Sequence, residues 1–451
     1  MDPIKERKEK VKTPAPKVIA SGSRNINKAR GCALFLSFLF VKQRVQPPAP
    51  VLIPRFLRKK GDLRMNIVQF REYCNENFEV ARWGETIRDS RKRPQISAPK
   101  VFGVLMEMPA LGQRSLLAVD EFARSPEAKV WHESHRKMVV SDTTLTRVAE
   151  SMEPKSIREA GYRVIRNGDE QALWDRKLPS GKRIRMGILD GHHAGGLWAS
   201  VLTISGKTEG VVDLERYPGY GHELSGSRRL LKRSFRKLGP GFFNVVAADA
   251  LYADHEDFEL CLAHGSHLLV KTEEETLTVI QDARHLFSCP KSKDFQGIGH
   301  VQGLDCTKAI EYEVFWTEGM DWQGIPLTVA WVKERHLKPA KGRPEHSEFW
   351  VLTTATGFTG EDLREMAHAR WHIENLIFRR LNALVNHKRY RGRHLEAMET
   401  LLRIWMIGLT LLGAYLYERG WHRFEQTWET MKKTWRAVAE QMRFSLLRFC
   451  T

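Results

Sequence analysis

The chain has 451 residues, of which 42% are hydrophobic, enough to build the cores of two or three globular domains. Its formal net charge of +18 indicates a polyanionic partner, and nucleic acid is the commonest such partner of a basic soluble protein. The six cysteines form no C-x-x-C pair and lack the His spacing of a zinc site. They favour reduced thiols in a cytoplasmic protein.

The positive charge is concentrated at the N-terminus. Residues 1–60 carry 15 Lys and Arg residues against only Asp2, Glu6 and Glu9. This composition predicts a basic, disordered arm that binds DNA nonspecifically. The alternative is a translational extension ahead of a true start at Met65, where the composition changes abruptly.

Two apolar runs raise the question of a membrane. Cys32–Val41 spans ten residues and Ile404–Tyr417 spans fourteen, and both are shorter than the roughly 20 residues that cross a bilayer. We therefore expect no membrane association.

The region from Met65 to Tyr162 has a helical pattern. Ser141 can cap a helix that carries Leu145 and Val148 on one face. We expect a helical N-terminal domain over residues 65–162. It either binds DNA ends or caps the rest of the protein, and no helix-turn-helix signature decides between the two.

Strand patterns begin after Arg183. Met186, Ile188 and Asp190 alternate with other residues, as in a strand with one buried face. Further strands are expected at 198–205, 211–217, 242–248 and 267–271, with a basic helix at 224–238 and another helix at 254–264. A three-strand meander followed by βαβαβ units predicts an α/β fold with a mixed sheet flanked by helices.

Residues 276–354 are rich in aromatic and β-branched residues and predict an inserted β subdomain. Helices resume at Thr359. The last part of the chain, residues 418–451, is expected to be a C-terminal helical segment.

Two aspartates follow or end predicted strands. Asp190 is expected to end the first strand, and Asp249 ends the apolar central one. Ligands of open α/β sheets bind at the carboxyl ends of the strands, which would place both carboxylates at a site. Each Asp alone is equally well explained as a turn residue, so the pair needs a third partner.

The third partner comes from a helix that begins near Glu361. One buried stripe at helical spacing is formed by Met366, Arg370, Ile373, Ile377, Leu381 and Leu384. Glu374 falls beside this stripe. Buried charges must be paired or coordinated, so Arg370 and Glu374 form either a structural i,i+4 ion pair or a DNA-facing Arg beside a metal-facing Glu.

Three segments resemble the catalytic motifs of bacterial transposases of the insertion-sequence-four group, which carry an Asp-Asp-Glu (DDE) triad. The segments are Ile188-Leu189-Asp190-Gly191, Val246-Ala247-Ala248-Asp249-Ala250-Leu251-Tyr252 and Arg370-Trp371-His372-Ile373-Glu374-Asn375. In that family the third motif reads Tyr, two residues, Arg, three residues, Glu, six residues, Lys. Arg370 and Glu374 match it, whereas the Tyr and Lys positions hold Ala367 and Leu381.

This resemblance implies a ribonuclease-H-like catalytic domain over residues 183–417, with the β-rich insertion between Asp249 and Glu374. It implies a transposase that cleaves transposon ends and joins 3′ ends to target DNA as a homodimer on double-stranded DNA. Two Mg²⁺ ions, replaceable by Mn²⁺, would be bridged by Asp190 and held on either side by Asp249 and Glu374.

Other candidates are less specific. Lys271 at the end of its strand and Arg370 are the predicted DNA-binding residues, with a solvated charge as the alternative for Lys271. His192 and His193 are explained as well by a turn as by a ligand role. Among Trp316, Trp322, Trp331 and Trp350, one is able to stack on an extruded base, whereas core positions are expected for most.

Two further functions stay open from the sequence. The Ala367 and Leu381 departures suggest a catalytically decayed DNA-binding descendant. A nuclease of the same fold without strand transfer is the other alternative.

Overall fold

The computed structural model describes residues 67–125, 140–289, 296–339, 342, 344–389, 394–419 and 435–443. All of them lie in one compact unit, Asp62–Thr451. The predicted basic arm, its apolar run and most of the C-terminal segment lie outside the described residues. The predicted domain boundaries stay a prediction.

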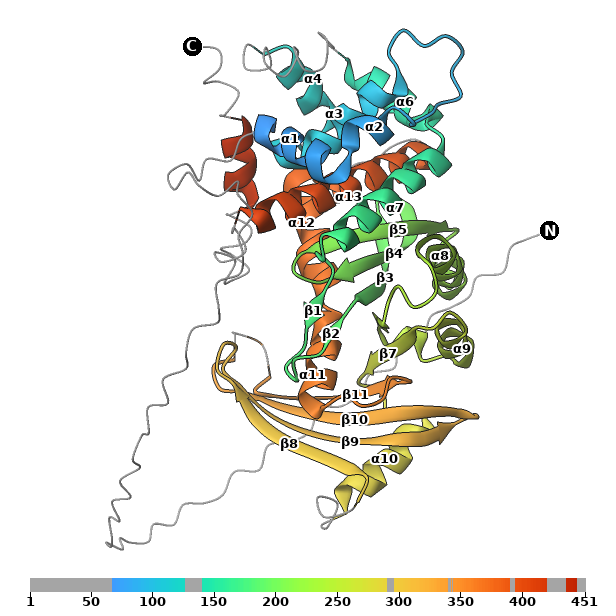
Figure 1. The fold of residues 1–451 in the computed structure, drawn as a ribbon, viewed down its shortest axis with the longest axis vertical. Helices are drawn as coiled ribbons and strands as arrows, with labels where there is room; N and C mark the ends of the chain where they lie inside the picture. The colour runs from blue at the N-terminus through green and yellow to red at the C-terminus, as the bar shows by residue number, and fades with distance from the viewer. Residues whose placement is uncertain are drawn as a thin grey trace, which may run out of the picture. The chain divides into compact units, whose positions relative to one another are not determined.

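A nine-stranded mixed sheet runs through the described part of the chain (Figure 1). Its strands are β3 (Met186–Ala194), β4 (Leu197–Ser205), β5 (Glu209–Tyr217), β6 (Val245–Ala248), β7 (His267–Thr272), β8 (Ile298–Asp305), β9 (Ile310–Trp322), β10 (Ile325–His336) and β11 (His346–Thr353). In space their order is β5-β4-β3-β6-β7-β11-β10-β9-β8. β3 pairs with β6 and β6 with β7 in parallel, and the other pairs are antiparallel. The predicted α/β fold with a mixed sheet flanked by helices is confirmed.

The predicted β insertion extends this sheet instead of forming a separate one. β11 pairs with β7 through residue pairs such as Thr353↔Leu269, so β8–β11 continue the sheet past β7. The insertion begins with a helix, α10 (Thr278–Ser288), whose Phe287 ring stacks on Trp350. Aromatic residues thus bind α10 to one face of the added strands.

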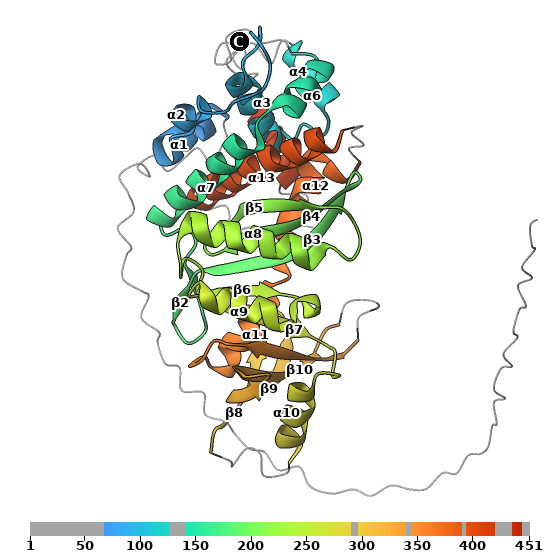
Figure 2. The same cartoon turned by 90° about the vertical axis from the view of Figure 1, so that its right-hand side faces the viewer.

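The apolar run of β6 is explained by cover on both faces. Val245 and Ala247 belong to a core cluster with α11 (Gly360–Ala369). Val246 and Ala248 belong to the core cluster of the other helices, which include α8 (Glu223–Leu238) and α9 (His255–Ala263). Figure 2 shows α8 and α9 along the strands. A strand buried on both sides is apolar throughout, as the sequence predicted.

Most of the charge of the predicted basic helix α8 is neutralised within the fold. Arg228 pairs with Asp254 and Asp257, and Arg233 pairs with Asp213. A run of positive residues on this helix therefore does not by itself form a DNA-binding face.

The helices before the sheet gather around one long C-terminal helix, α13 (Leu395–Glu418) (Figure 1). These helices are α1 (Ile67–Phe78), α2 (Val80–Gly84), α3 (Ala98–Leu111), α4 (Leu116–Ala123), α6 (Asp142–Ser151) and α7 (Pro154–Glu170). Ser141 caps α6 as predicted, accepting from the backbone N–H of Thr144. The helices share one hydrophobic core with the sheet.

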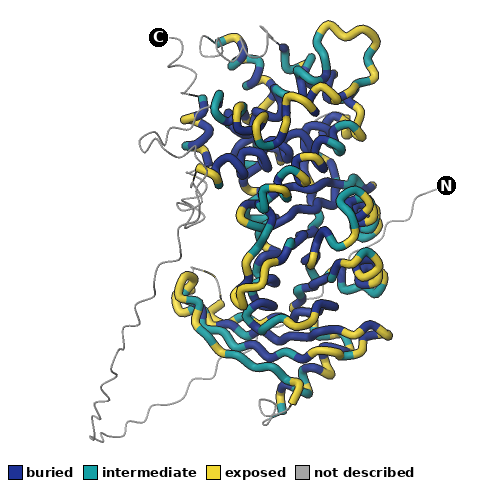
Figure 3. Tube along the Cα trace, in the orientation of Figure 1, coloured by how far each residue is buried: buried dark blue, intermediate teal, exposed yellow. Residues whose placement is uncertain are grey.

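α13 is buried along most of its length (Figure 3). By length and composition it could cross a membrane, but 94% of its apolar stretch is buried inside the protein. Gly408 lets α13 approach α3 closely, because a side chain there would overlap the carbonyl oxygen of Met106. The helix therefore serves as the core element between α3 and β5.

Candidate functional site

Strand alternation places the two aspartates on the same face of the sheet. Asp190 shares the strand face of Met186, and Asp249 continues the face of Val245. Met186 and Val245 pack in the cluster that contains α11. The chain continues from α11 into a π-helical segment, η5 (Ile373–Phe378), that carries Glu374. All three predicted carboxylates therefore belong to one side of the sheet.

Asp190 does not end its strand, contrary to the prediction. β3 continues to Ala194 because β4 pairs with it in an antiparallel hairpin as far as Ala194↔Leu197. The parallel pairing of β3 with β6 stops earlier, at Ile188↔Ala247. Asp190 therefore lies beside the carboxyl end of β6, although its own strand runs on.

Asp249 directly follows β6, as predicted. Its Oδ1 accepts a hydrogen bond of 3.1 Å from the backbone N–H of Leu251 and so caps the short 3₁₀ helix η3 (Ala250–Tyr252). This bond fixes the orientation of the carboxylate at the edge of the sheet.

Arg370 lies between two of the predicted carboxylates. Its Nη1 is 3.8 Å from Oδ2 of Asp190, and its Nη2 is 3.5 Å from Oε1 of Glu374. The predicted i,i+4 ion pair thus exists, but the same guanidinium also faces the sheet. Arg370 is 8% exposed, whereas the Glu374 side chain is 38% exposed.

The electrostatics of Asp190 are those of a carboxylate short of positive charge. Burial raises its pKa, Arg370 lowers it, and Asp249, Glu374 and Glu223 raise it again, with a net pKa of about 7. One guanidinium does not offset burial and three carboxylates. Such an imbalance in a cluster of carboxylates is typical of functional sites.

Glu223 is a fourth carboxylate that the sequence reasoning missed. It is the first residue of α8, and its carboxylate accepts hydrogen bonds from Tyr252 Oη (2.9 Å) and Tyr217 Oη (3.2 Å). It packs over Gly191, where any side chain would overlap it. Glu223 therefore sits directly beside Asp190 and links it to the turn that follows Asp249.

Lys271 and Trp371 lie close to Arg370. The Nζ of Lys271 is 4.0 Å from the centre of the Phe349 ring and 5.8 Å from that of Trp371. The Arg370 guanidinium is 4.7 Å from the Trp371 ring. Burial lowers the pKa of Lys271. Trp371 is 41% exposed, and this exposed ring between two cations was not singled out from the sequence.

The donor set fits a hard divalent cation. Carboxylate oxygens are the ligands that Mg²⁺ prefers, and the raised pKa of Asp190 reflects a repulsion that a bound cation would relieve. Within the described ranges, however, no three His, Cys, Asp or Glu side chains already stand in the arrangement of a metal centre. The guanidinium of Arg370 takes part of that space.

The two histidines after Asp190 lie in β3 and not in a turn, because the strand is longer than predicted. His192 is buried, with Nε2 2.9 Å from Nε2 of His387, and its ring stacks on Phe378. His193 stacks on Trp198. Both have structural partners.

The tryptophans of the β insertion are mostly core residues. Trp322, Trp331 and Trp350 are buried, and Trp331 stacks on Trp350. Trp316 covers Gly299 on the neighbouring strand. The core interpretation of the three buried tryptophans is confirmed.

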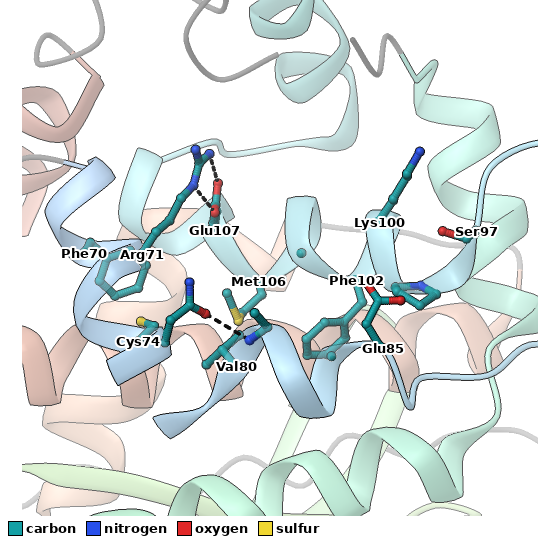
Figure 4. Close-up of a pocket in the computed structure, with 15 residues that line it drawn as sticks. Phe70, Arg71, Cys74, Val80, Glu85, Ser97, Lys100, Phe102, Met106 and Glu107 are labelled. Atoms are coloured by element: carbon teal, nitrogen blue, oxygen red, sulfur yellow. Dashed lines mark hydrogen bonds and ion pairs between the residues drawn. The ribbon is translucent and has the colours of Figure 1, made fainter. Parts of the chain in front are cut away.

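A cavity of about 550 Å³ lies among α1, α2 and α3 (Figure 4). Its charged lining includes Arg71, which donates to both carboxylate oxygens of Glu107. Residues from the sheet and from η5 do not line it. This cavity is therefore separate from the carboxylate site.

Comparison with known families bears on the carboxylate site. Residues 191–411 match the family model described as "Transposase DDE domain". This chain carries a DDE transposase domain. The match covers just under half of the chain, begins directly after Asp190 and contains Asp249 and Glu374. The insertion-sequence-four group in particular is not established by this match.

A solved structure of the piggyBac transposase synaptic complex with hairpin DNA aligns to this DDE transposase chain with 11% sequence identity. The alignment covers 85% of this chain and 81% of that chain, with a TM-score of 0.35. A similarity this low supports no conclusion about fold or function. No curated protein matches the chain.

Proposed function

We propose that the protein is a DNA transposase that binds transposon ends, cleaves them by two-metal hydrolysis and joins the 3′ ends to target DNA. The observation that carries the proposal is the convergence of Asp190, Asp249 and Glu374 on one guanidinium and on one another, in and directly beside a DDE domain. A polar cluster that is short of positive charge has the chemistry of a site for cations and phosphates.

Divalent metal ions are generally used by domains of this family, and we assign them here to the three carboxylates. Asp190 would lie between two Mg²⁺ ions, with Asp249 on one side and Glu374 on the other, and Mn²⁺ would substitute. When bound, two such ions activate the attacking oxygen and stabilise the leaving 3′ oxygen. Asp190 must lose its proton to bind them, because only the carboxylate is a ligand.

The cations of the chain are assigned to DNA. Arg370 presents a planar guanidinium that matches a phosphate, and a phosphate can replace the Asp190 and Glu374 carboxylates as its partner. Lys271, whose ammonium lies over two aromatic rings near Arg370, is assigned to the neighbouring phosphate. Each contact holds the DNA end against the carboxylates.

The partners follow from this chemistry. We propose double-stranded DNA, both transposon end and target, and a homodimer assembled on it. We also propose a bacterial cytoplasmic protein associated with the nucleoid. Membership of the insertion-sequence-four group remains part of the same proposal.

A decayed DNA-binding descendant is the second candidate. Ala367 and Leu381, which stand where the insertion-sequence-four motif has Tyr and Lys, are both fully buried. Neither position can contact DNA as it stands. This descendant would still bind DNA ends but would not cut them, whereas a nuclease of the same fold would cut without joining.

The test is a cleavage and joining assay on the inverted repeats that flank the reading frame, with Mg²⁺ and with Mn²⁺. The proposal expects nicked or fully cut ends and joined products with either ion, and none with EDTA. Binding without cutting favours the descendant, and cutting without joining favours the nuclease.

A further inference from the structure

We infer that Glu209 is a positioning residue for Glu374 and acts by holding both ends of the π-helical segment η5. The inference rests on the proposed function, in which Glu374 is a metal ligand. Glu209 is the first residue of β5 and contacts neither Asp190 nor Glu374 through any hydrogen bond or ion pair printed for the described side chains. It therefore acts through its neighbours.

Glu209 is a nearly buried carboxylate between two cationic groups. Its side chain is 13% exposed, with Oε2 3.2 Å from Nη1 of Arg380 and Oε1 3.6 Å from Nδ1 of His372. Burial raises its pKa, but His372, Arg380 and Arg176 outweigh burial and bring the pKa to about 2. Glu209 is thus ionised and strongly held, the opposite of Asp190.

The two partners of Glu209 flank Glu374 in the sequence. His372 directly precedes η5, and Arg380 follows it in α12 (Arg379–Val385). Within the segment, the backbone N–H of Arg379 bonds to the carbonyl of Glu374, five residues back. One carboxylate on the sheet therefore anchors both ends of the turn that carries Glu374.

A π-helical turn needs such an anchor. Runs with i→i+5 bonds are rare and occur mostly as single turns at functional sites. Relaxation to an α-helix would rotate one end of the segment relative to the other and turn Glu374 away from its present direction. The anchor sits on polar contacts, because Ser205 Oγ also lies 3.3 Å from Nδ1 of His372.

The experiment is a double-mutant cycle on the full chain, read out by Mn²⁺ binding in calorimetry without DNA. Glu209→Gln should weaken Mn²⁺ binding about tenfold, since loss of a residue that orients a ligand costs about 10- to 100-fold in affinity. In the Glu374→Ala background the same substitution should have no further effect, because the residue it positions is gone.

Glu215→Gln is the matched control. Glu215 lies further along β5 and pairs with Arg229 and Arg233, so this substitution removes an ion pair from the same strand without touching η5. It should leave Mn²⁺ affinity unchanged. His372→Gln breaks one of the two contacts of Glu209, and it replaces Glu209→Gln in the cycle if that variant does not fold.

The outcomes separate the two claims. Equal weakening by Glu209→Gln in both backgrounds would overturn the positioning role and leave the proposed function standing. Wild-type Mn²⁺ affinity in Glu374→Ala would overturn the metal assignment and, with it, the role of Glu209. A loss confined to the background with an intact Glu374 supports both.

Discussion

Two aspartates on neighbouring parts of the sheet have opposite surroundings. Asp213 on β5 accepts hydrogen bonds from Tyr162 and Arg233, and it pairs with Arg403. Asp190 on β3, with only β4 between the two strands, faces one guanidinium and three carboxylates. Burial raises the pKa of both, but three arginines bring that of Asp213 below its ordinary value, whereas that of Asp190 rises to about 7.

The difference separates a residue that holds the fold together from one that holds a ligand. Asp213 is neutralised by the protein itself, since its side chain is 2% exposed and fully surrounded by donors. Asp190 leaves a charge imbalance that the protein does not resolve. Residue type and burial are the same, so the neighbours alone decide the role.

The sharpest test of the comparison is the removal of each predicted ligand. Asp190→Ala, Asp249→Ala and Glu374→Ala should each reduce cleavage by at least about a thousandfold, on the order of 4 kcal/mol, while DNA binding in a mobility-shift assay stays close to wild type. Asp120→Ala, on α4 and paired only with Arg124, is the control. Wild-type cleavage in any of the three variants would refute the assignment.

Asp213→Asn should instead cost stability. The substitution leaves buried arginines without their carboxylate, which is expected to cost about 3–5 kcal/mol in the free energy of unfolding. Asp190→Asn should be neutral or stabilising in the same denaturant titration, because it removes a repelled charge. If both variants lost the same stability, the contrast between the two aspartates would be wrong.

The pH dependence of stability should differ in sign. The folded state retains the proton of Asp190 between pH 4 and about 7, whereas the unfolded chain has lost it, so the contribution of Asp190 to stability falls as pH rises through this window. The loss is at most about 4 kcal/mol. Asp213, with its lowered pKa, loses its contribution only as pH falls below its ordinary value.

Unfolding titrations at pH 5 and pH 8 in EDTA, on wild type and Asp190→Asn, measure the first effect. The Asn variant should lose less stability than wild type between the two pH values. An identical loss in both proteins would show that Asp190 titrates normally.

The smallest expected effect is that of Arg370→Ala. Loss of a charge-assisted hydrogen bond of about 1.5–3 kcal/mol should weaken binding of the DNA end about ten- to a hundredfold. Arg82→Ala, which removes an exposed positive charge on α2, is the control. Lower thermal stability with normal end binding would favour the purely structural ion pair with Glu374.

The sequence was sufficient for the parts of the fold that local patterns determine. The apolar run of β6 followed by Asp249, the Ser141 cap and the buried stripe of Ile373 and Ile377 are all confirmed. Alternation also placed Asp190 on the correct strand face. Only the length of β3 was wrong, because it depends on pairing with β4.

Other features of the site arise from contacts between distant segments. Glu223 reaches Asp190 only because Gly191 leaves space for it and because α8 begins at that point. The π-helical turn around Glu374 is equally hidden, since apolar residues four apart suit an α-helix as well. Glu209, far from Arg380 in the sequence, has no local signature.

The close contact of α13 with α3 at Gly408 has a consequence for synthesis. The core between the early helices and the sheet is completed by a helix that leaves the ribosome near the end of translation, so the nascent chain exposes apolar surfaces of α3 and β5 until then. A chain that stops before Leu395 would lack this cover and aggregate. Premature termination in the last tenth of the reading frame therefore removes the whole protein, not only its C-terminus.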